Sequence, residues 1–376
     1  GTPAVLLVNS KGMSLSLAAL IRAFLEPLPG MADARNDCRD SYIRGVILNQ
    51  MTASMYPALK EKIEQKLPVK VLGYVQRLED CVIESRHLGL VTPEEIGDLR
   101  QRVQELADVL EQTLDVDGIL ELSEKAPDLD VDMPEALEVF LKNSRKEAAE
   151  RLAESCEREA GDLSPVNSIA EEPQVRIAVA RDEAFCFYYE DNLELLERLG
   201  AVLVEFSPVH DKKLPEEIQG ILFGGGYPEL YAEKLSGNHS MLESVRAAVA
   251  TGMPYLAECG GFMYLHETME DMEGKSWPMA GIFPGHVKKT DRLGRFGYVT
   301  LTAKKPQIFG TAGAQIRAHE FHYFDSSYNG DAFHARKPVG KRNWDCIVAG
   351  ENFAAGFPHL YYYSNPEFVR CFVEKC

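Results

Sequence analysis

MPYLAECGGFMYL, residues 253–265, is the stretch that decides the fold of this chain. A short apolar run leads into Cys259 and two glycines, after which helix-compatible residues resume. This order predicts a buried strand that turns sharply into a helix, with the cysteine at the carboxyl edge of a parallel sheet. The glycines permit a tight turn and the close approach of a substrate. Cys259 is therefore a candidate nucleophile, and the alternative is an inert buried cysteine.

A helix that begins at these glycines would point its N–H groups and positive dipole end at the sulfur. We therefore expect the pKa of Cys259 to lie below the free value of about 8.5. A second glycine run, Gly224 to Gly226, follows the apolar residues 220–223. Glycines there can turn backbone N–H groups into a cleft, as an oxyanion hole requires, and Gly260 would add a second donor. The alternatives are a plain glycine turn and a phosphate cradle, but the Lys and Ser/Thr of a Walker loop are missing.

A cysteine nucleophile needs a base, and three histidines are candidates. His319 and His322 lie in AHEFHY, 318–323, and His359 lies in GFPHLY, 356–361. The HEFH spacing differs from HExxH, so no metal site is predicted there. From the residues alone any of the three could reach the thiol, and each could instead be a hydrogen-bonded core or surface histidine.

A basic segment stands out in this acidic chain. It comprises Lys288, Lys289 and the run RLGRFGY, 292–298. Arginine is a planar, bidentate partner for carboxylates, so the segment predicts a site for a carboxylate-rich substrate. A solvated loop with chance charges is the alternative.

Composition narrows the class of protein. The chain has 376 residues, 45% of them apolar, which predicts about two globular domains. A net charge of -18 argues against nucleic acid or an anionic membrane as the main partner. There is no run of eighteen apolar residues, which excludes a transmembrane helix, and the first residues resemble a strand rather than a signal peptide. The eight cysteines include no CxxC pair, so we expect neither a disulfide framework nor a zinc site, and a cytoplasmic location.

The alternation of apolar runs and amphipathic segments predicts an α/β fold with two α/β domains, 1–165 and 174–376. In the first, strands are expected at 4–8, 45–49 and 69–75, and helices at 14–25, 56–66 and 92–114. Three strands are few, so we expect this domain to be incomplete at its N-terminus. The Gly-, Ser- and Pro-containing segment 161–173 is the predicted boundary. The second domain should have strands at 175–180, 201–206, 220–223 and 254–258, helices at 189–199 and 240–251, short strands after 296 and a final helix from 366.

Several long motifs resemble those of cobyrinic acid a,c-diamide synthases, in consistent order along the whole chain. They are KGMS (11–14), RHLGL (86–90), RIAVARDEAF (176–185), FYY (187–189), GGGYPEL (224–230), AECGGFMYL (257–265), RFGY (295–298), HEFHY (319–323) and PHLYYYSNP (358–366). The resemblance implies a P-loop-type, dethiobiotin-synthetase-like domain followed by a class I glutamine amidotransferase domain with a flavodoxin-like fold. It implies a ligase that uses ATP, Mg²⁺ and glutamine to amidate the a and c acetate side chains of cobyrinic acid in cobalamin biosynthesis.

By this resemblance Cys259 is the glutaminase nucleophile, His359 its base, and Gly225, Gly226 and Gly260 the oxyanion donors. The substrate-binding residues expected from it are Arg295, Tyr298, His319, Glu320 and His322. Many glutaminases of this class carry a glutamate two residues after the histidine, where this chain has Tyr361. The third member of the triad therefore stays open between none, a backbone carbonyl and another carboxylate. Ala257 also stands where the elbow usually has a glycine.

The family's Walker loop lies upstream of the segment that resembles 1–49, and no GxxxxGK[ST] occurs in this sequence. We therefore expect most of the phosphate and magnesium site to lie outside this chain, with Asn49 as a nucleotide-binding candidate. Alone, the chain would have at most glutaminase activity. The alternatives are a non-catalytic or partner-dependent glutaminase subunit, or a synthase that acts on hydrogenobyrinate or Ni-sirohydrochlorin. A homodimer is one option for the assembly.

Overall fold

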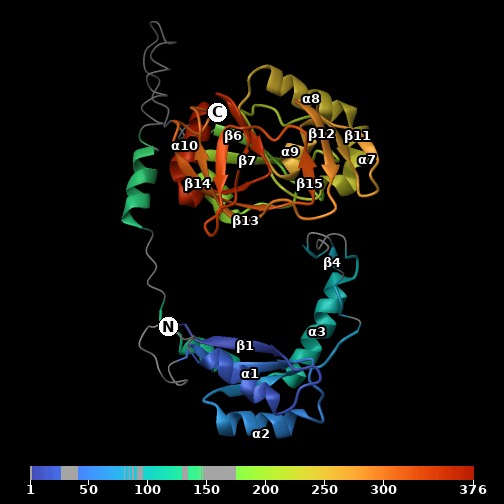
Figure 1. Ribbon diagram of the computed structural model, residues 1–376, viewed down its shortest axis with the longest axis vertical. Coiled ribbons are helices and arrows are strands. Elements are labelled where there is room, and N and C mark those ends of the chain that lie inside the picture. The colour runs from blue at the N-terminus through green and yellow to red at the C-terminus, as the bar shows by residue number, and fades with distance from the viewer. Residues whose placement is uncertain are drawn as a thin grey trace, which may run out of the picture. The chain divides into compact units, whose positions relative to one another are not determined.

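A computed structural model describes residues 2–26, 41–79, 81–83, 85–86, 89–90, 96–128, 134–144, 146 and 175–376 (Figure 1). The chain divides into two compact units, Gly1–Asp132 and Met133–Cys376. The predicted boundary at 161–173 lies outside the described residues. A helix at 135–144 belongs to the second unit, because its Leu141 is buried in that unit's core.

The first unit is built on a parallel three-stranded sheet in the order β1-β2-β3. Its core comes from the strands and from the apolar faces of α1 and α2, with Leu17, Val46 and Ile63 almost fully buried. The elements are β1 (Ala4–Asn9), α1 (Ser16–Leu25), β2 (Ile43–Asn49), α2 (Tyr56–Lys66), β3 (Lys70–Val75), β4 (Ser85–Arg86), β5 (Gly89–Leu90), α3 (Leu99–Thr113) and α4 (Val116–Glu124). β1 to β3, α1 and α2 lie where the sequence predicted them, whereas β4 and β5 were not predicted. The helix predicted from residue 92 begins only at Leu99, and residues 91–95 lie outside the described part of the chain.

The second unit is organised around a six-stranded sheet in the order β18-β19-β9-β8-β6-β7. All neighbours are parallel except β18, which gives the flavodoxin-like order 2-1-3-4-5 for the five parallel strands. Ligands bind such sheets beyond the carboxyl ends of the strands. The strands are β6 (Val175–Ala180), β7 (Ala201–Phe206), β8 (Gly220–Phe223), β9 (Tyr255–Glu258), β18 (Val348–Ala349) and β19 (Phe353–Gly356).

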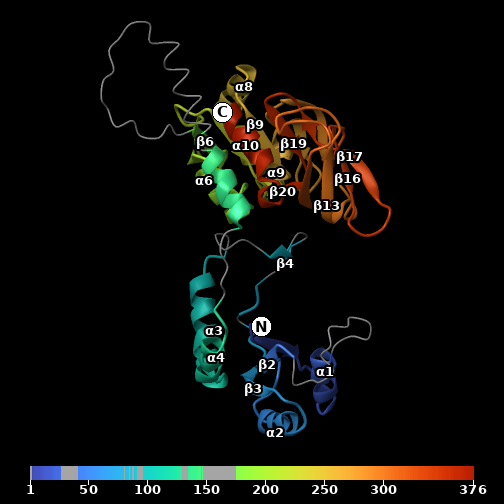
Figure 2. The same ribbon diagram turned by 90° about the vertical axis from the view of Figure 1, so that its left-hand side faces the viewer.

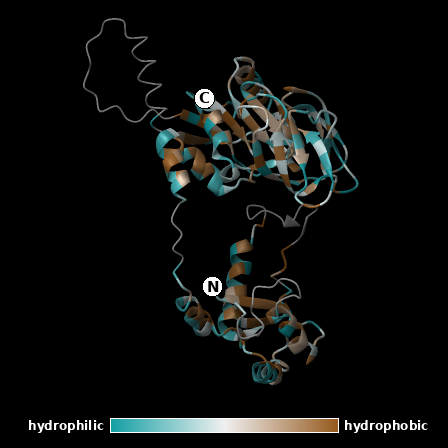
Figure 3. Ribbon diagram, turned by 60° about the vertical axis from the view of Figure 1, so that its left-hand side comes forward, coloured by the Kyte–Doolittle hydropathy of each residue, from teal (hydrophilic) through white to brown (hydrophobic). Residues whose placement is uncertain are grey.

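Alternate residues of these strands enter two different cores, because side chains on a strand point to opposite faces. Ile177 and Val179 of β6 pack with α6 (Glu190–Arg198) and α10 (Pro366–Lys375), which lie side by side in Figure 2. Ala178 and Ala180 pack with α7 (Ala232–Gly237), α8 (His239–Ala250) and α9 (Gly260–Tyr264). Figure 3 shows brown, apolar colouring along the strands and mixed colouring along the helices. The sheet is therefore covered on both faces, as a parallel sheet requires.

Two further sheets complete the second unit. A five-stranded sheet, β17-β16-β13-β14-β20, joins the α6 and α10 core through residues such as Leu301 and Ile316. Its strands are β13 (Phe296–Ala303), β14 (Gln315–Phe321), β16 (Phe333–Arg336), β17 (Asn343–Cys346) and β20 (His359–Tyr361). A four-stranded sheet comprises β10 (His266–Glu270), β11 (Ser276–Pro278), β12 (Phe283–Lys289) and β15 (Phe324–Ser326). The short strands thus begin at residue 266, thirty residues before the predicted start at 296.

Two absences apply to the part of the chain that the structure describes. No helix there is long and apolar enough to cross a membrane. The six cysteines in that part are all free thiols.

Candidate active site

The sharp corner predicted at Cys259 is present. Cys259 follows β9 directly and precedes the short helix α9, with φ 48° and ψ −103°. A positive φ is rare for a residue with a side chain and marks strain that functional sites often retain. Its N–H donates to the Gly356 carbonyl of the neighbouring strand β19 (2.8 Å), and its carbonyl accepts from Met263 (3.0 Å). Both contacts hold the corner at the carboxyl edge of the sheet.

The prediction of a lowered thiol pKa is wrong. Burial, and then the carboxylate of Glu229, raise the pKa of Cys259 well above its ordinary value, while the Gly260 N–H opposes the rise. Glu320 and Glu258 add to the rise through their charges. The helix α9 has only five residues, so its dipole is too small to compensate for burial among carboxylates. The Cys259 side chain is therefore a neutral thiol at pH 7.

The glycines around Cys259 make room for close packing. A Cβ on Gly261 would lie 2.5 Å from the Phe223 carbonyl oxygen, and one on Gly226, whose φ is 147°, would lie 2.2 Å from the Ala184 oxygen. The Gly225 N–H donates to the Phe187 carbonyl (3.2 Å), so it is not available as the predicted oxyanion donor. The Gly226 N–H has no acceptor among the described residues, and its nitrogen would lie 3.3 Å from a Cβ on Gly260. Of the three predicted oxyanion donors, the N–H groups of Gly226 and Gly260 therefore remain, and these two residues are adjacent in space.

His359, the first residue of β20, lies directly over Gly225. A Cβ added to Gly225 would be only 2.4 Å from Cε1 of the imidazole. The ring is buried and packs edge-on against Phe187, with centroids 4.8 Å apart. Burial lowers the pKa of His359 to about 3, and the neighbouring His319 and His322 add to the effect. The imidazole is therefore neutral at pH 7.

Glu258 is a residue that the sequence prediction passed over, although it stands immediately before Cys259 in the AECGG motif. Its Oε2 lies 3.8 Å from Nδ1 of His359, and its Oε1 accepts a hydrogen bond from the Tyr362 hydroxyl at 3.3 Å. Burial raises the pKa of Glu258 to about 8, although the Leu360 N–H and the Tyr362 hydroxyl offset part of the rise. The neighbour of the nucleophile therefore contacts the candidate base.

The predicted substrate residues fall into two groups. The first is a buried polar cluster of Arg295, Glu320 and His322, which we call the Arg295 cluster. Arg295 pairs with Asp325 and lies over the Phe357 ring, and His322 stacks on the same ring with centroids 4.0 Å apart. Burial raises the pKa of Glu320 to about 7 and lowers that of His322 to about 4. Both carboxylate oxygens of Glu320 and Nε2 of His322 are buried without a hydrogen-bond partner among the described residues.

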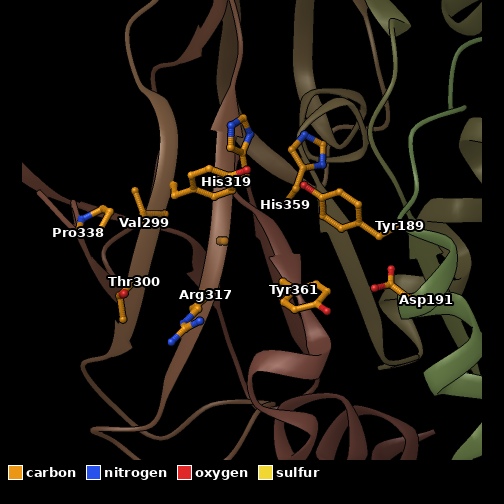
Figure 4. A pocket seen from close by; sticks show the side chains of 11 residues that line it. Tyr189, Asp191, Val299, Thr300, Arg317, His319, Pro338, His359 and Tyr361 are labelled. Atoms are coloured by element: carbon orange, nitrogen blue, oxygen red, sulfur yellow. The ribbon is translucent and has the colours of Figure 1, made fainter. Parts of the chain in front are cut away.

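The second group forms a row that leads to His359. Tyr298 on β13, His319 on β14 and His359 on β20 are direct cross-strand neighbours. They line a cavity of about 670 Å³, together with Arg317, Tyr189 and other residues (Figure 4). Tyr298 is 74% exposed and His359 only 6%, so the row runs from solvent to the buried base. The cavity is large enough for a ligand of drug size.

Comparisons with known proteins bear on this geometry. Residues 176–366 match the family model described as the CobB/CobQ-like glutamine amidotransferase domain. The chain is 34% identical to the cobyrinate a,c-diamide synthase of Caldanaerobacter subterraneus subsp. tengcongensis, over 100% of this chain and 74% of that protein. It is 37% identical to the synthase of the same name from Salmonella typhimurium, over 98% of this chain and 73% of that protein. This chain belongs to the cobyrinate a,c-diamide synthase family.

The synthase of Dehalococcoides mccartyi strain CBDB1 is a further relative, 36% identical over 99% of this chain and 73% of that protein. The family match confirms the recognition made from the motifs and the α/β amidotransferase fold of residues 176–366. Most of the elbow is visible in sequence, because Gly260 and Gly261, which follow Cys259, have no room for side chains. Glu258 could have been found the same way, as the acidic residue next to the nucleophile.

The described residues of the first unit do not fit a magnesium–triphosphate site. Asn49 ends β2, where its side-chain oxygen accepts from the Gln50 N–H (3.0 Å) and its carbonyl accepts from Ser10. Its side-chain nitrogen could still donate a hydrogen bond to the adenine base of a nucleotide. The sequence contains no Walker-type glycine loop that would bind the phosphates of that nucleotide. No group of three His, Cys, Asp or Glu residues in the described part of the chain could hold a metal ion.

Proposed function

We propose that this chain is the glutamine-hydrolysing part of a cobyrinate a,c-diamide synthase, a carbon–nitrogen ligase that transfers glutamine nitrogen to side-chain carboxylates of a corrinoid. The observation that carries the proposal is the strained Cys259 corner together with the neutral His359, which lies over Gly225 in the glycine run whose Gly226 nitrogen lies next to Gly260. The family membership of the whole chain supports the same reaction.

The first half of the reaction follows from the protonation states of the two residues. The Cys259 sulfur attacks the side-chain amide carbon of glutamine while the neutral His359 accepts the thiol proton. A neutral thiol with a raised pKa needs this base, because it forms little thiolate on its own. The C–N bond then breaks as His359 returns the proton to the leaving nitrogen. This gives ammonia and a Cys259 thioester, and water cleaves the thioester to glutamate.

The N–H groups of Gly226 and Gly260 are the proposed donors to the tetrahedral oxyanion. Each such donor typically contributes about 10²–10³ in rate. Gly225 instead supplies the space in which the His359 ring lies. For glutamine itself we propose the Arg295 cluster, since the partnerless oxygens of Glu320 and Nε2 of His322 would gain partners from a polar substrate.

The corrinoid is proposed to approach along the row from Tyr298 through His319. Exposed aromatic rings offer a flat apolar surface, and Arg317 lines the same cavity with no ion-pair partner for its guanidinium among the described residues. A guanidinium in this position can bind a carboxylate in bidentate fashion. ATP, which would activate that carboxylate, and Mg²⁺ are part of the proposal through the family alone, as is Asn49 as a contact to the nucleotide. A cytoplasmic location and a homodimer stay predictions from the sequence.

The experiment is to measure glutamate release from glutamine by the wild-type chain and by Cys259→Ala. We expect measurable release by the wild type and none by the variant. Cys186→Ala is the matched control, since Cys186 is an exposed cysteine of the same unit. Equal release by Cys259→Ala and the wild type would refute the nucleophile and with it the proposed function.

The alternatives differ in substrate and in dependence on a partner. Mass spectrometry of the products formed from cobyrinate, hydrogenobyrinate or Ni-sirohydrochlorin, with ATP and glutamine, distinguishes the tetrapyrroles. A glutaminase that stays idle until a second polypeptide is added would support the partner-dependent subunit.

A further inference from the structure

His359 lacks the acidic neighbour expected two residues later. That position is Tyr361, which has a phenol hydroxyl in place of a carboxylate. Residues 359 and 361 lie on the same face of β20, because side chains alternate along a strand. The Tyr361 ring packs edge-on against Tyr189 with centroids 6.5 Å apart and is 41% exposed. Tyr361 thus lines the open cavity, and it does not place a carboxylate next to His359.

A different carboxylate lies on the Nδ1 side of the same imidazole. Oε2 of Glu258 is 3.8 Å from Nδ1 of His359, and both side chains are largely buried, 13% and 8% exposed. Both also line one small cavity together with Tyr188, Asn192 and Tyr362. Glu258 therefore faces the same space as this nitrogen.

The Glu258 carboxylate is itself held in place from two directions. The Tyr362 hydroxyl donates to Oε1, and the Leu360 N–H from β20 also donates to the carboxylate. Tyr362 is anchored in turn, because its N–H donates to the Asn192 side chain at 2.9 Å. Two residues that closely follow His359 in sequence, Leu360 and Tyr362, therefore fix the group that its Nδ1 faces.

We propose that Glu258 is the positioning residue of the glutaminase: its carboxylate accepts the Nδ1 proton of His359 in a hydrogen bond and so leaves Nε2 for the Cys259 thiol. This inference rests on the proposed glutaminase function. An acceptor oxygen in this role fixes the tautomer and orientation of the imidazole. Above the Glu258 pKa of about 8 the ionised carboxylate also stabilises the imidazolium that forms during attack. The acidic partner thus precedes the nucleophile in the chain instead of following the histidine.

The test compares Glu258→Gln, Glu258→Asp and Glu258→Ala in glutamate release by the full chain. We expect Glu258→Gln to lower kcat by about 10- to 100-fold with KM changed less than about threefold, because a misoriented base slows chemistry without removing a substrate contact. Glu258→Asp should keep more activity than Glu258→Gln. Added formate should raise the activity of Glu258→Ala, since it can enter the space of the missing carboxylate.

Glu270→Gln is the matched control, because Glu270 also ends a strand of this unit and accepts a backbone N–H. Wild-type kcat in Glu258→Gln, with a folded protein and no release by Cys259→Ala, would overturn the inference and leave the proposed function intact. A loss in Glu258→Gln that neither aspartate nor formate relieves would also overturn it, since a structural role predicts that outcome.

Discussion

Gly225 lies directly beneath the His359 ring. A side chain added at Gly225 therefore tests whether the position of the ring matters for activity. In Gly225→Ala the new methyl group would lie 2.4 Å from Cε1 of the imidazole, whereas ordinary contact begins at 3.4 Å. The φ of Gly225 is outside the left-handed region, so the backbone accepts alanine without strain. The ring must therefore move by 3.4 − 2.4 = 1.0 Å to relieve the overlap.

The imidazole has little freedom to make this movement and stay productive. Phe187 packs against it at 4.8 Å between centroids, and Glu258 lies 3.8 Å from Nδ1. A displacement of about 1 Å at a catalytic group costs about 100-fold in rate, which corresponds to about 2.7 kcal/mol in the activation barrier. We expect kcat for glutamate release to fall by about this factor in Gly225→Ala.

The assay is steady-state glutamate release, with tryptophan fluorescence to confirm folding. Both tryptophans, Trp277 and Trp344, lie in the second unit, so their emission reports on the part of the chain that holds the site. Gly237→Ala is the control, since its Cβ would meet no atom within 4 Å and Gly237 is exposed. A folded Gly225→Ala variant whose kcat stays within about threefold of the wild type would refute the argument that this ring must stay in place.

Three further outcomes are expected from the same unit. Arg317→Gln should weaken the binding of cobyrinate about tenfold in a calorimetric titration, because a hydrogen bond to a charged group contributes about 1.5–3 kcal/mol; unchanged affinity would remove Arg317 from the corrinoid site. His322 has its pKa lowered to about 4, so only the unfolded state, with a pKa near 6.5, takes up its proton as pH falls below 6.5. The wild type should therefore lose about 2 kcal/mol more stability than His322→Gln between pH 7 and pH 5 in urea unfolding, and parallel curves would contradict this. Phe372→Ala should lower the free energy of unfolding by about 3–5 kcal/mol, because the ring is fully buried between α10 and the sheet, and a loss below about 1 kcal/mol would contradict its place in the core.

The parallel strands were predictable because burial on both faces makes each of them a continuous apolar run. VRIAVA, AVLVEF and GILF coincide with β6, β7 and β8. The corner at Cys259 was predictable for a related reason, since the glycines beside it have no room for side chains. In contrast, β10 to β12 mix charged and apolar residues in short half-exposed segments, as in FPGHVKK, and no single period identifies them.

What sequence could not provide is the environment that tertiary contacts create. The rise in the pKa of Cys259 depends on burial and on Glu229 and Glu320, which lie 30 and 61 positions away in the chain. The bond from the Gly225 N–H to Phe187 depends on an isolated bridge between distant residues. Neither follows from the local pattern of the glycine run, so the donor role of Gly225 was wrongly predicted.

The backbone angles of Cys259 also affect how this position can evolve. A non-glycine residue held at φ 48° and ψ −103° costs about 1–3 kcal/mol relative to a relaxed backbone. Glycine would relieve that cost, but it would also empty the space of a side chain that is 6% exposed and belongs to the core around α7, α8 and α9. The packing of the core thus holds the strained corner in place, and a change to glycine exchanges backbone relief for lost burial.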